Sequence, residues 1–171
     1  RFAAKLDFEI EQHSAAPIPD MADLLFDIPA ARLFDESLKL LMSGQGVKTF
    51  DLLHYYYLFE PLFPATEEAI EQNPDYSLAL IRQALANTDD RIREGRPVTP
   101  AFLFAALLWP ALAPRIKALE DQGVPTIPAQ QQAAQDLITE QCQHIAIPKR
   151  FSVPLREIWD MQPRLERRSG R

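Results

Sequence analysis

Cysteine, glycine and histidine are scarce in this 171-residue sequence, and each scarcity excludes a class of site. The one cysteine, Cys142, cannot form an internal disulfide or a zinc site built from several cysteines of the same chain. Five scattered glycines form neither a G-x-G-x-x-G nor a G-K-[ST] phosphate-binding loop. His13, His54 and His144 lie far apart and lack the H-E-x-x-H spacing of a metal site. We therefore predict no catalytic residue and no metal ligand in this chain.

Long apolar runs are missing as well. The longest, AFLFAALLWPALA, is interrupted by Pro110 and is shorter than the roughly 20 residues that cross a bilayer. We expect a buried helix there and no contact with a membrane. The first residues show no basic region followed by an apolar stretch and a cleavage site, so secretion is not indicated and we expect a cytoplasmic protein.

What is present is an acidic, apolar-rich composition with an uneven charge. Hydrophobic residues make up 47% and charged residues 25%, as in a globular protein. The net charge of −6 argues against nucleic-acid binding by the chain as a whole, because contacts to phosphates need clustered Lys and Arg. From Lys149 to Arg171, however, seven basic residues face three acidic ones. A contact with a polyanion is therefore expected near the C-terminal end.

The apolar residues recur with helical spacing along almost the whole chain, and this predicts an all-α fold. The end of one helix is expected at Gly44, and the start of another at Thr99 and Pro100, a favourable cap and first position. A helix from residue 47 is expected to continue until just before Pro61. The expected helical segments are 30–44, 47–60, 65–73, 76–95, 98–123, 127–148 and 153–168.

The aromatic run HYYYLF, residues 54–59, has two interpretations. Its rings could stack on nucleic-acid bases. Helical spacing instead places Phe50, Leu53 and Tyr57 on one face, which favours packing in the core.

Several blocks of the sequence resemble a known family in the same order along the chain. The opening RFAAKLDFEIEQH, which has no initiator methionine and already has helical spacing, is similar to the segment after the catalytic head of bacterial poly(A) polymerases, close relatives of the tRNA CCA-adding nucleotidyltransferases. The similarity continues through IPAARLFDESLKLLMSG, LFEPLFP, NTDDRI, PAFLFAALLW and AIPKR. It implies a helical neck, residues 1–28, and a multi-helix RNA-binding body, residues 29–171, that ends in the start of a basic tail.

The resemblance implies that the chain positions RNA for an enzyme that adds AMP from ATP to RNA 3′ ends. The nucleotidyltransferase head, with its paired aspartates, Mg²⁺ and ATP, would lie before Arg1, so this chain is expected to be inactive by itself and to hold no cofactor. The partners implied are RNA 3′ ends and that head. Phosphate contacts are expected from Arg1, Lys5, Lys149, Arg150, Arg156, Arg164, Arg167 and Arg168.

Three points stay open at the level of sequence. The same region of a CCA-adding enzyme, or a helical interaction module without a catalytic head, would give a similar pattern. Each of the eight basic residues could instead be an ordinary solvated charge. Asp89 and Arg91 in NTDDRI match a family block, but pairing between helices explains them equally well.

Overall fold

The structure, a computed structural model, describes the backbone of residues 28–169 and the side chains of residues 28–161. Every regular element in this range is a helix, which confirms the all-α prediction. The helices are α3 (Ala30–Leu41), α4 (Gly46–Tyr55), α5 (Phe59–Leu62), α6 (Pro64–Gln72), α7 (Pro74–Arg93), α8 (Pro100–Asp121), α9 (Thr126–Gln141) and α10 (Lys149–Ser169). The predicted neck, residues 1–28, lies almost wholly outside the described residues and stays a prediction.

The apolar helix α8 occupies the centre of the body, and α6, α7, α9 and α10 pack against it. By length and composition alone α8 could cross a membrane, yet 56% of its apolar 18-residue stretch is buried inside the body. The central helix of a helical domain meets the same criteria, so this finding fits the buried helix that the sequence predicts. Thr99 caps its start as expected, because its Oγ1 accepts a hydrogen bond from the Phe102 N–H at 3.3 Å.

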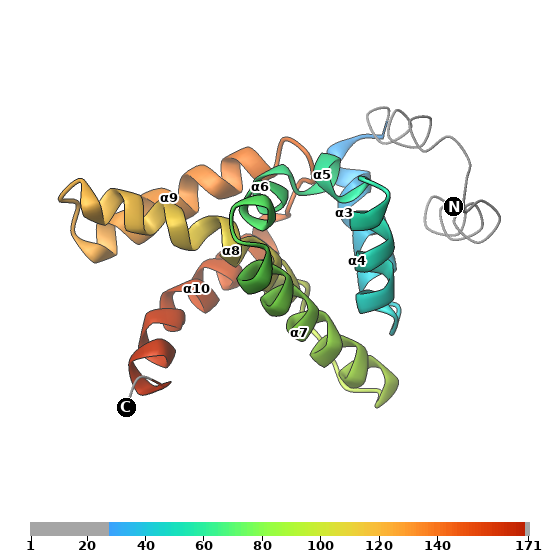
Figure 1. Cartoon of the computed structure of the whole chain (residues 1–171). Coiled ribbons are helices and arrows are strands. Elements are labelled where there is room, and N and C mark those ends of the chain that lie inside the picture. The colour runs from blue at the N-terminus through green and yellow to red at the C-terminus, as the bar shows by residue number, and fades with distance from the viewer. Residues whose placement is uncertain (1–27, 170–171) are drawn as a thin grey trace.

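Figure 1 shows three helical projections around this centre: the α8–α9 hairpin, the far end of α7, and the end of α10. The α3–α4 pair lies beside α7, on the opposite side from the end of α10 (Figure 1). These three projections leave long polar helix faces exposed to solvent. Each projection therefore offers its own surface, apart from the shared core.

A continuous row of phenylalanine rings joins the helices in the core. Centroids of successive rings lie between 5.0 and 5.7 Å apart. The row connects α10, α3, α8, α5 and α4 through Phe151, Phe34, Phe104, Phe63, Phe59 and Phe50. Trp159 ties α10 to α8, since its indole N–H donates to the Ala105 carbonyl at 3.0 Å. Aromatic pairs of this kind add about 0.5–1.5 kcal/mol each to the area that they bury.

The segment predicted as one helix from residue 47 to 60 is two helices, and that prediction is wrong. Helix α4 ends at Tyr55, and Tyr57 has a φ of +60°, which a right-handed helix cannot contain. Helix α5 then includes Pro61 in its first turn, where the absent N–H would have no partner within the helix. The burial predicted for this face fails at the same point: Phe50 and Leu53 are buried, but Tyr57 is 78% exposed.

Candidate RNA-binding surface

The predicted basic residues fall into three groups in the structure. Lys149 and Arg150 form the exposed first turn of α10, and Arg156 lies about two turns further along the same helix. Arg164, Arg167 and Arg168 belong to the backbone of α10, but their side chains lie outside the described part, as do Arg1 and Lys5 altogether. The structure therefore places six of the eight predicted residues on α10 and describes the side chains of three of them.

The first turn of α10 presents two cations that no carboxylate of the described residues neutralises. Neither Lys149 nor Arg150 makes an ion pair with a described residue. The Arg150 guanidinium lies 4.8 Å from the centre of the Phe151 ring, and this ring stacks on Phe34 of α3 at 5.7 Å. The cation–π contact orients the guanidinium without using its N–H donors, which stay available for a phosphate.

Arg156 is less available than its neighbours. It is half-buried, and its guanidinium donates a hydrogen bond to the side-chain oxygen of Gln135 on α9. This contact fastens α10 to α9. A role in holding the helices together therefore competes with the predicted contact to phosphate.

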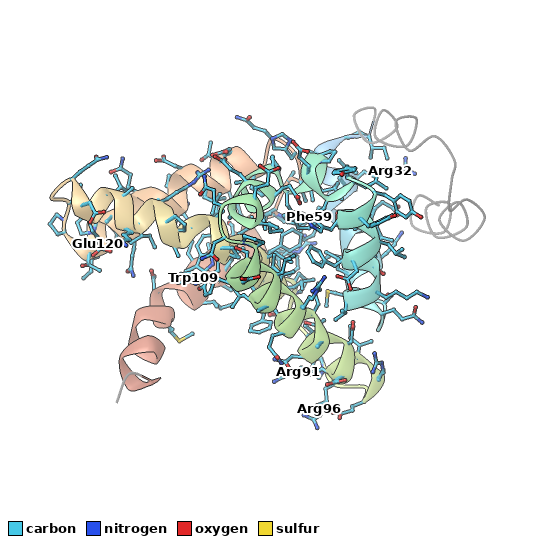
Figure 2. All side chains as sticks on the ribbon, viewed as in Figure 1. Arg32, Phe59, Arg91, Arg96, Trp109 and Glu120 are labelled. Atoms are coloured by element: carbon cyan, nitrogen blue, oxygen red, sulfur yellow. The ribbon has the colours of Figure 1, made fainter. Side chains whose placement is uncertain are left out.

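Other arginines of the described body already pair with carboxylates. Arg82 reaches Asp51 at 2.9 Å, and Arg115 reaches Glu140 at 2.8 Å. The hydrogen bond from Arg115 lowers the pKa of Glu140, although partial burial of that carboxyl opposes the effect. Arg96 pairs with Glu94 at 2.7 Å near the far end of α7, where Figure 2 shows Arg91 and Arg96 away from the core. These pairs reduce the net field that the rest of the surface offers to RNA.

An open groove of about 800 Å³ runs between α4 and α7. Its lining includes Lys48, Tyr55 and Arg93 as well as the carboxylates Asp89 and Asp90. For the run HYYYLF, helical spacing favours core packing over base stacking, yet Tyr55 and Tyr57 are 73% and 78% exposed. The signal that could have indicated them is the run of three tyrosines, because three consecutive helical residues cannot share one buried face.

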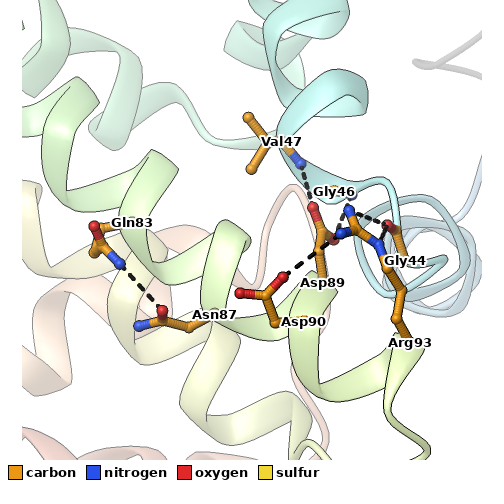
Figure 3. Close-up of polar contacts among 8 residues, drawn as sticks. All are labelled: Gly44, Gly46, Val47, Gln83, Asn87, Asp89, Asp90 and Arg93. Carbon is orange, nitrogen blue, oxygen red and sulfur yellow. Dashed lines mark hydrogen bonds and ion pairs between the residues drawn. The ribbon is translucent and has the colours of Figure 1, made fainter.

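Asp89 builds one end of this groove and belongs to the NTDDRI block. Its carboxylate, 3% exposed, accepts hydrogen bonds from the Gly46 N–H at 2.6 Å and from the Val47 N–H at 3.1 Å (Figure 3). Asp89 thus caps the N-terminus of α4 from a different helix. Arg93, one turn along, donates to the Gly44 carbonyl at 3.2 Å (Figure 3). The contacts agree with the helix-pairing interpretation for Asp89.

Two further ionisable groups lie at the joint of α4 and α6. His54 Nδ1 is 3.2 Å from a carboxylate oxygen of Glu67, and the imidazole stacks on Phe50 with ring centres 5.8 Å apart. Burial raises the pKa of Glu67, while the nearby His54 opposes that rise. Among residues 28–161, no three His, Cys, Asp or Glu side chains gather where they could hold a metal ion.

The described body is all-helical and presents an exposed basic turn, and comparison with known proteins identifies the family to which it belongs. Residues 7–70 match a family model described as the probable RNA and SrmB-binding site of polymerase A. Residues 122–171 match a second model, the polymerase A arginine-rich C-terminus.

Curated relatives are similar over the entire chain. Poly(A) polymerase I of Salmonella typhi and of Escherichia coli O157:H7 are each 46% identical over all of this chain, which spans 37% of their length. Poly(A) polymerase I of Haemophilus influenzae is 42% identical over 99% of the chain, or 38% of its own length. The chain belongs to the bacterial poly(A) polymerase family and is an RNA-binding region of that family.

Proposed function

We propose that this chain holds the RNA while a nucleotidyltransferase head, outside the chain, adds AMP from ATP to the RNA 3′ end and releases pyrophosphate. The observation that carries the proposal is similarity along the entire chain to Poly(A) polymerase I, including a match to an RNA-binding model over residues 7–70. The chain spans only 37% of that relative, which leaves ample length for a separate catalytic part.

The contribution of these residues is positioning. Lys149 and Arg150 contact phosphates of the RNA backbone, and such contacts are independent of sequence. A fixed backbone brings the 3′ hydroxyl in line with the α-phosphate of ATP, which lowers the entropic part of the barrier. Mg²⁺ would neutralise charge on the phosphates during the transfer. We assign Mg²⁺ and ATP to the head, as the family resemblance implies.

The proposed partners are accordingly an RNA 3′ end and the nucleotidyltransferase head of the same protein, in the bacterial cytoplasm. The proposal places no membrane among the partners, and the burial of α8 in the body supports this. By itself the chain is expected to transfer no nucleotide.

The test measures how tightly the full-length protein binds fluorescently labelled oligo(A) at several salt concentrations, by fluorescence anisotropy. The variant carries Lys149→Ala and Arg150→Ala. Removing one cation that touches a phosphate of single-stranded RNA should reduce the slope of log K against log salt by about 0.7, so the expected reduction for two is about 1.4. Weaker binding with a shallower slope supports the proposal.

A matched control removes two positive charges elsewhere, through Lys39→Ala and Arg96→Ala. Both residues are exposed and already pair with carboxylates, so the control should leave the slope nearly unchanged. Equal slopes in the wild type and the Lys149 and Arg150 variant would remove these two residues from the RNA contact. Incubation with ATP or with CTP separates the two branches of the superfamily: a poly(A) polymerase extends many RNAs with A alone, and a CCA-adding enzyme adds C to tRNA.

A further inference from the structure

Two tyrosines stand out of the surface at the end of α4. Tyr55 is 73% exposed and Tyr57 is 78% exposed, whereas the phenylalanines of the same region, Phe50, Phe59 and Phe63, are fully buried. The exposed rings therefore add almost nothing to the core. Their presence needs another explanation.

The backbone conformation of Tyr57 also calls for an explanation. Its φ of +60° lies in the left-handed region, which residues with a Cβ rarely adopt. The Tyr57 N–H donates to the His54 carbonyl at 3.2 Å, and the Leu58 N–H donates to the Leu53 carbonyl at 2.8 Å. This pair of bonds is a Schellman motif, which commonly ends a helix with glycine at the left-handed position.

Two other helices of the described body end in the same motif, and both use glycine there. Gly95 closes α7 with a φ of +73°, and Gly123 closes α8 with a φ of +94°. A Cβ at either glycine would meet no atom within 4 Å, so the backbone conformation, not crowding, accounts for these glycines. The chain thus places glycine where only the turn is required. At the third position it carries a tyrosine, at a conformational cost that glycine would avoid.

Within the described residues, the Tyr57 side chain itself does not offset that cost. The Tyr57 side chain makes no hydrogen bond or ring contact with them. Strained residues of this kind cluster at functional sites, where the side chain serves a role that its backbone does not. Tyr55 is held differently: its ring meets Tyr56 edge to face, with centres 5.0 Å apart, and Tyr56 packs against the core. Tyr55 is therefore presented to solvent by a fixed neighbour.

The surroundings of Tyr55 are polar, which fits a nucleic acid better than an apolar protein surface. Tyr55 lines the groove between α4 and α7 together with Lys48, whereas Arg93 of the same lining is engaged by Asp90 and the Gly44 carbonyl. The carboxylates Asp51 and Asp90 of the same lining pair with arginines. Proteins that hold single strands combine aromatic rings for the bases with cations along the backbone. Charged residues, by contrast, are depleted at the centre of protein interfaces.

We propose that Tyr55 and Tyr57 stack on bases of single-stranded RNA, in addition to the phosphate contacts expected from α10. The inference deepens the proposed function and depends on it, since it requires that the chain binds RNA. Both tyrosines fall within residues 7–70, the segment that matches the RNA-binding model. Stacking tolerates any base, so this platform would hold RNA 3′ ends of varied sequence.

The test uses anisotropy of labelled oligo(A) with the full-length protein, and Tyr57→Gly is the most informative variant. Glycine relieves the left-handed backbone, so the urea midpoint of unfolding should rise. Loss of the ring should weaken oligo(A) binding by about 5- to 150-fold. A variant that becomes more stable while it loses affinity cannot be explained by misfolding.

Four further measurements identify the contact as stacking. Tyr55→Ala should weaken oligo(A) binding, and Tyr55→Phe should preserve it. Tyr55→Leu, which keeps apolar area but has no π face, should behave like Tyr55→Ala. An abasic oligomer of equal length should bind wild type and Tyr57→Gly equally well. Phe102→Ala, at an exposed aromatic on α8, is the control and should change neither probe.

The outcomes separate this inference from the proposed function. Wild-type binding of oligo(A) with unchanged affinity in Tyr55→Ala and Tyr57→Gly overturns the stacking platform and leaves RNA binding intact. Full affinity in Tyr55→Leu also overturns it, because an apolar contact would then suffice. Failure of the wild type to bind oligo(A) at low salt overturns both.

Discussion

Asp89→Ala is the substitution that most directly tests how the groove between α4 and α7 is built. The carboxylate is 3% exposed and accepts two backbone N–H bonds, at 2.6 and 3.1 Å, at the start of α4 (Figure 3). It comes from α7, 43 residues away from Gly46. Its removal therefore takes away a helix cap and a connection between two helices at once.

The magnitude follows from the groups left behind. Alanine leaves the buried Gly46 N–H without an acceptor, which costs about 1–3 kcal/mol. These bonds are also the cap of α4, so the typical cap value of about 1 kcal/mol is part of this cost and is not added to it. The Val47 N–H is only part-buried, and water can replace the missing acceptor. We expect Asp89→Ala to lower the free energy of unfolding by about 1–3 kcal/mol, or the melting temperature by about 2–12 °C for a chain of this size.

The measurement is urea-induced unfolding of the wild type and the variant, followed by circular dichroism. Asp90→Ala is the matched control, because this neighbour is 67% exposed and only meets Arg93 across 3.5 Å. Exposed pairs of this type contribute about 0–1 kcal/mol. If Asp89→Ala and Asp90→Ala agree within about 0.5 kcal/mol, Asp89 does not cap α4 in solution and the assignment is refuted.

Two further substitutions test the same region. Gly46→Ala would place a Cβ 2.6 Å from the Leu41 carbonyl oxygen, a backbone atom with little freedom to move. We therefore expect the free energy of unfolding, measured with urea, to fall by about 1–3 kcal/mol. A variant as stable as the wild type would contradict this close approach. Glu67→Gln tests the carboxyl whose pKa burial raises. In the wild type, the stabilising effect of the raised pKa is present below the unfolded-state pKa of about 4.3 and is lost as pH rises through the folded-state pKa. The variant should therefore gain stability relative to wild type between about pH 4 and pH 7, and urea midpoints that keep a constant difference would exclude this.

Local patterns in the sequence predict most of the helices for identifiable reasons. Thr99 and Pro100 are favourable at a helix start, and the helix expected to end at Gly44 ends at Leu41, with Gly44 at a φ of +91° in the turn that follows. Ile81 and Leu85 of α7, about one helical turn apart, are both buried in the core. These features depend on residues a few positions apart, which is the range over which a sequence pattern is informative.

The break at Tyr57 could not be found in that way. Helical spacing continues through residues 47–60, and tyrosine carries no sign that it will adopt a left-handed conformation. The bond that stabilises the break, from the Leu58 N–H to the Leu53 carbonyl, depends on burying both leucines in the core. Tertiary packing therefore overrides the local pattern, and it turns a residue expected inside into an exposed one.

The same limit applies to the basic residues. Composition points to the C-terminal segment, and the structure confirms that Lys149 and Arg150 are exposed. Composition could not reveal that Arg156 meets Gln135, because that residue lies on another helix, 21 positions away. Whether a basic side chain is available for a phosphate or already bonded within the protein depends on neighbours that are distant in the sequence.

Both ends of α4 are fixed by residues outside the helix, and this bears on how the proposed stacking of RNA bases on Tyr55 and Tyr57 would work. Asp89 of α7 holds its first N–H groups, and Leu58 anchors the turn that follows it in the core. The exposed rings at Tyr55 and Tyr57 therefore sit on a rigid support. A single strand that stacks on a fixed ring loses less free energy to ordering of the protein than one that must first organise a loop. The conformational cost at Tyr57 is then met when the protein folds, before RNA arrives, and the ring is ready for an incoming base.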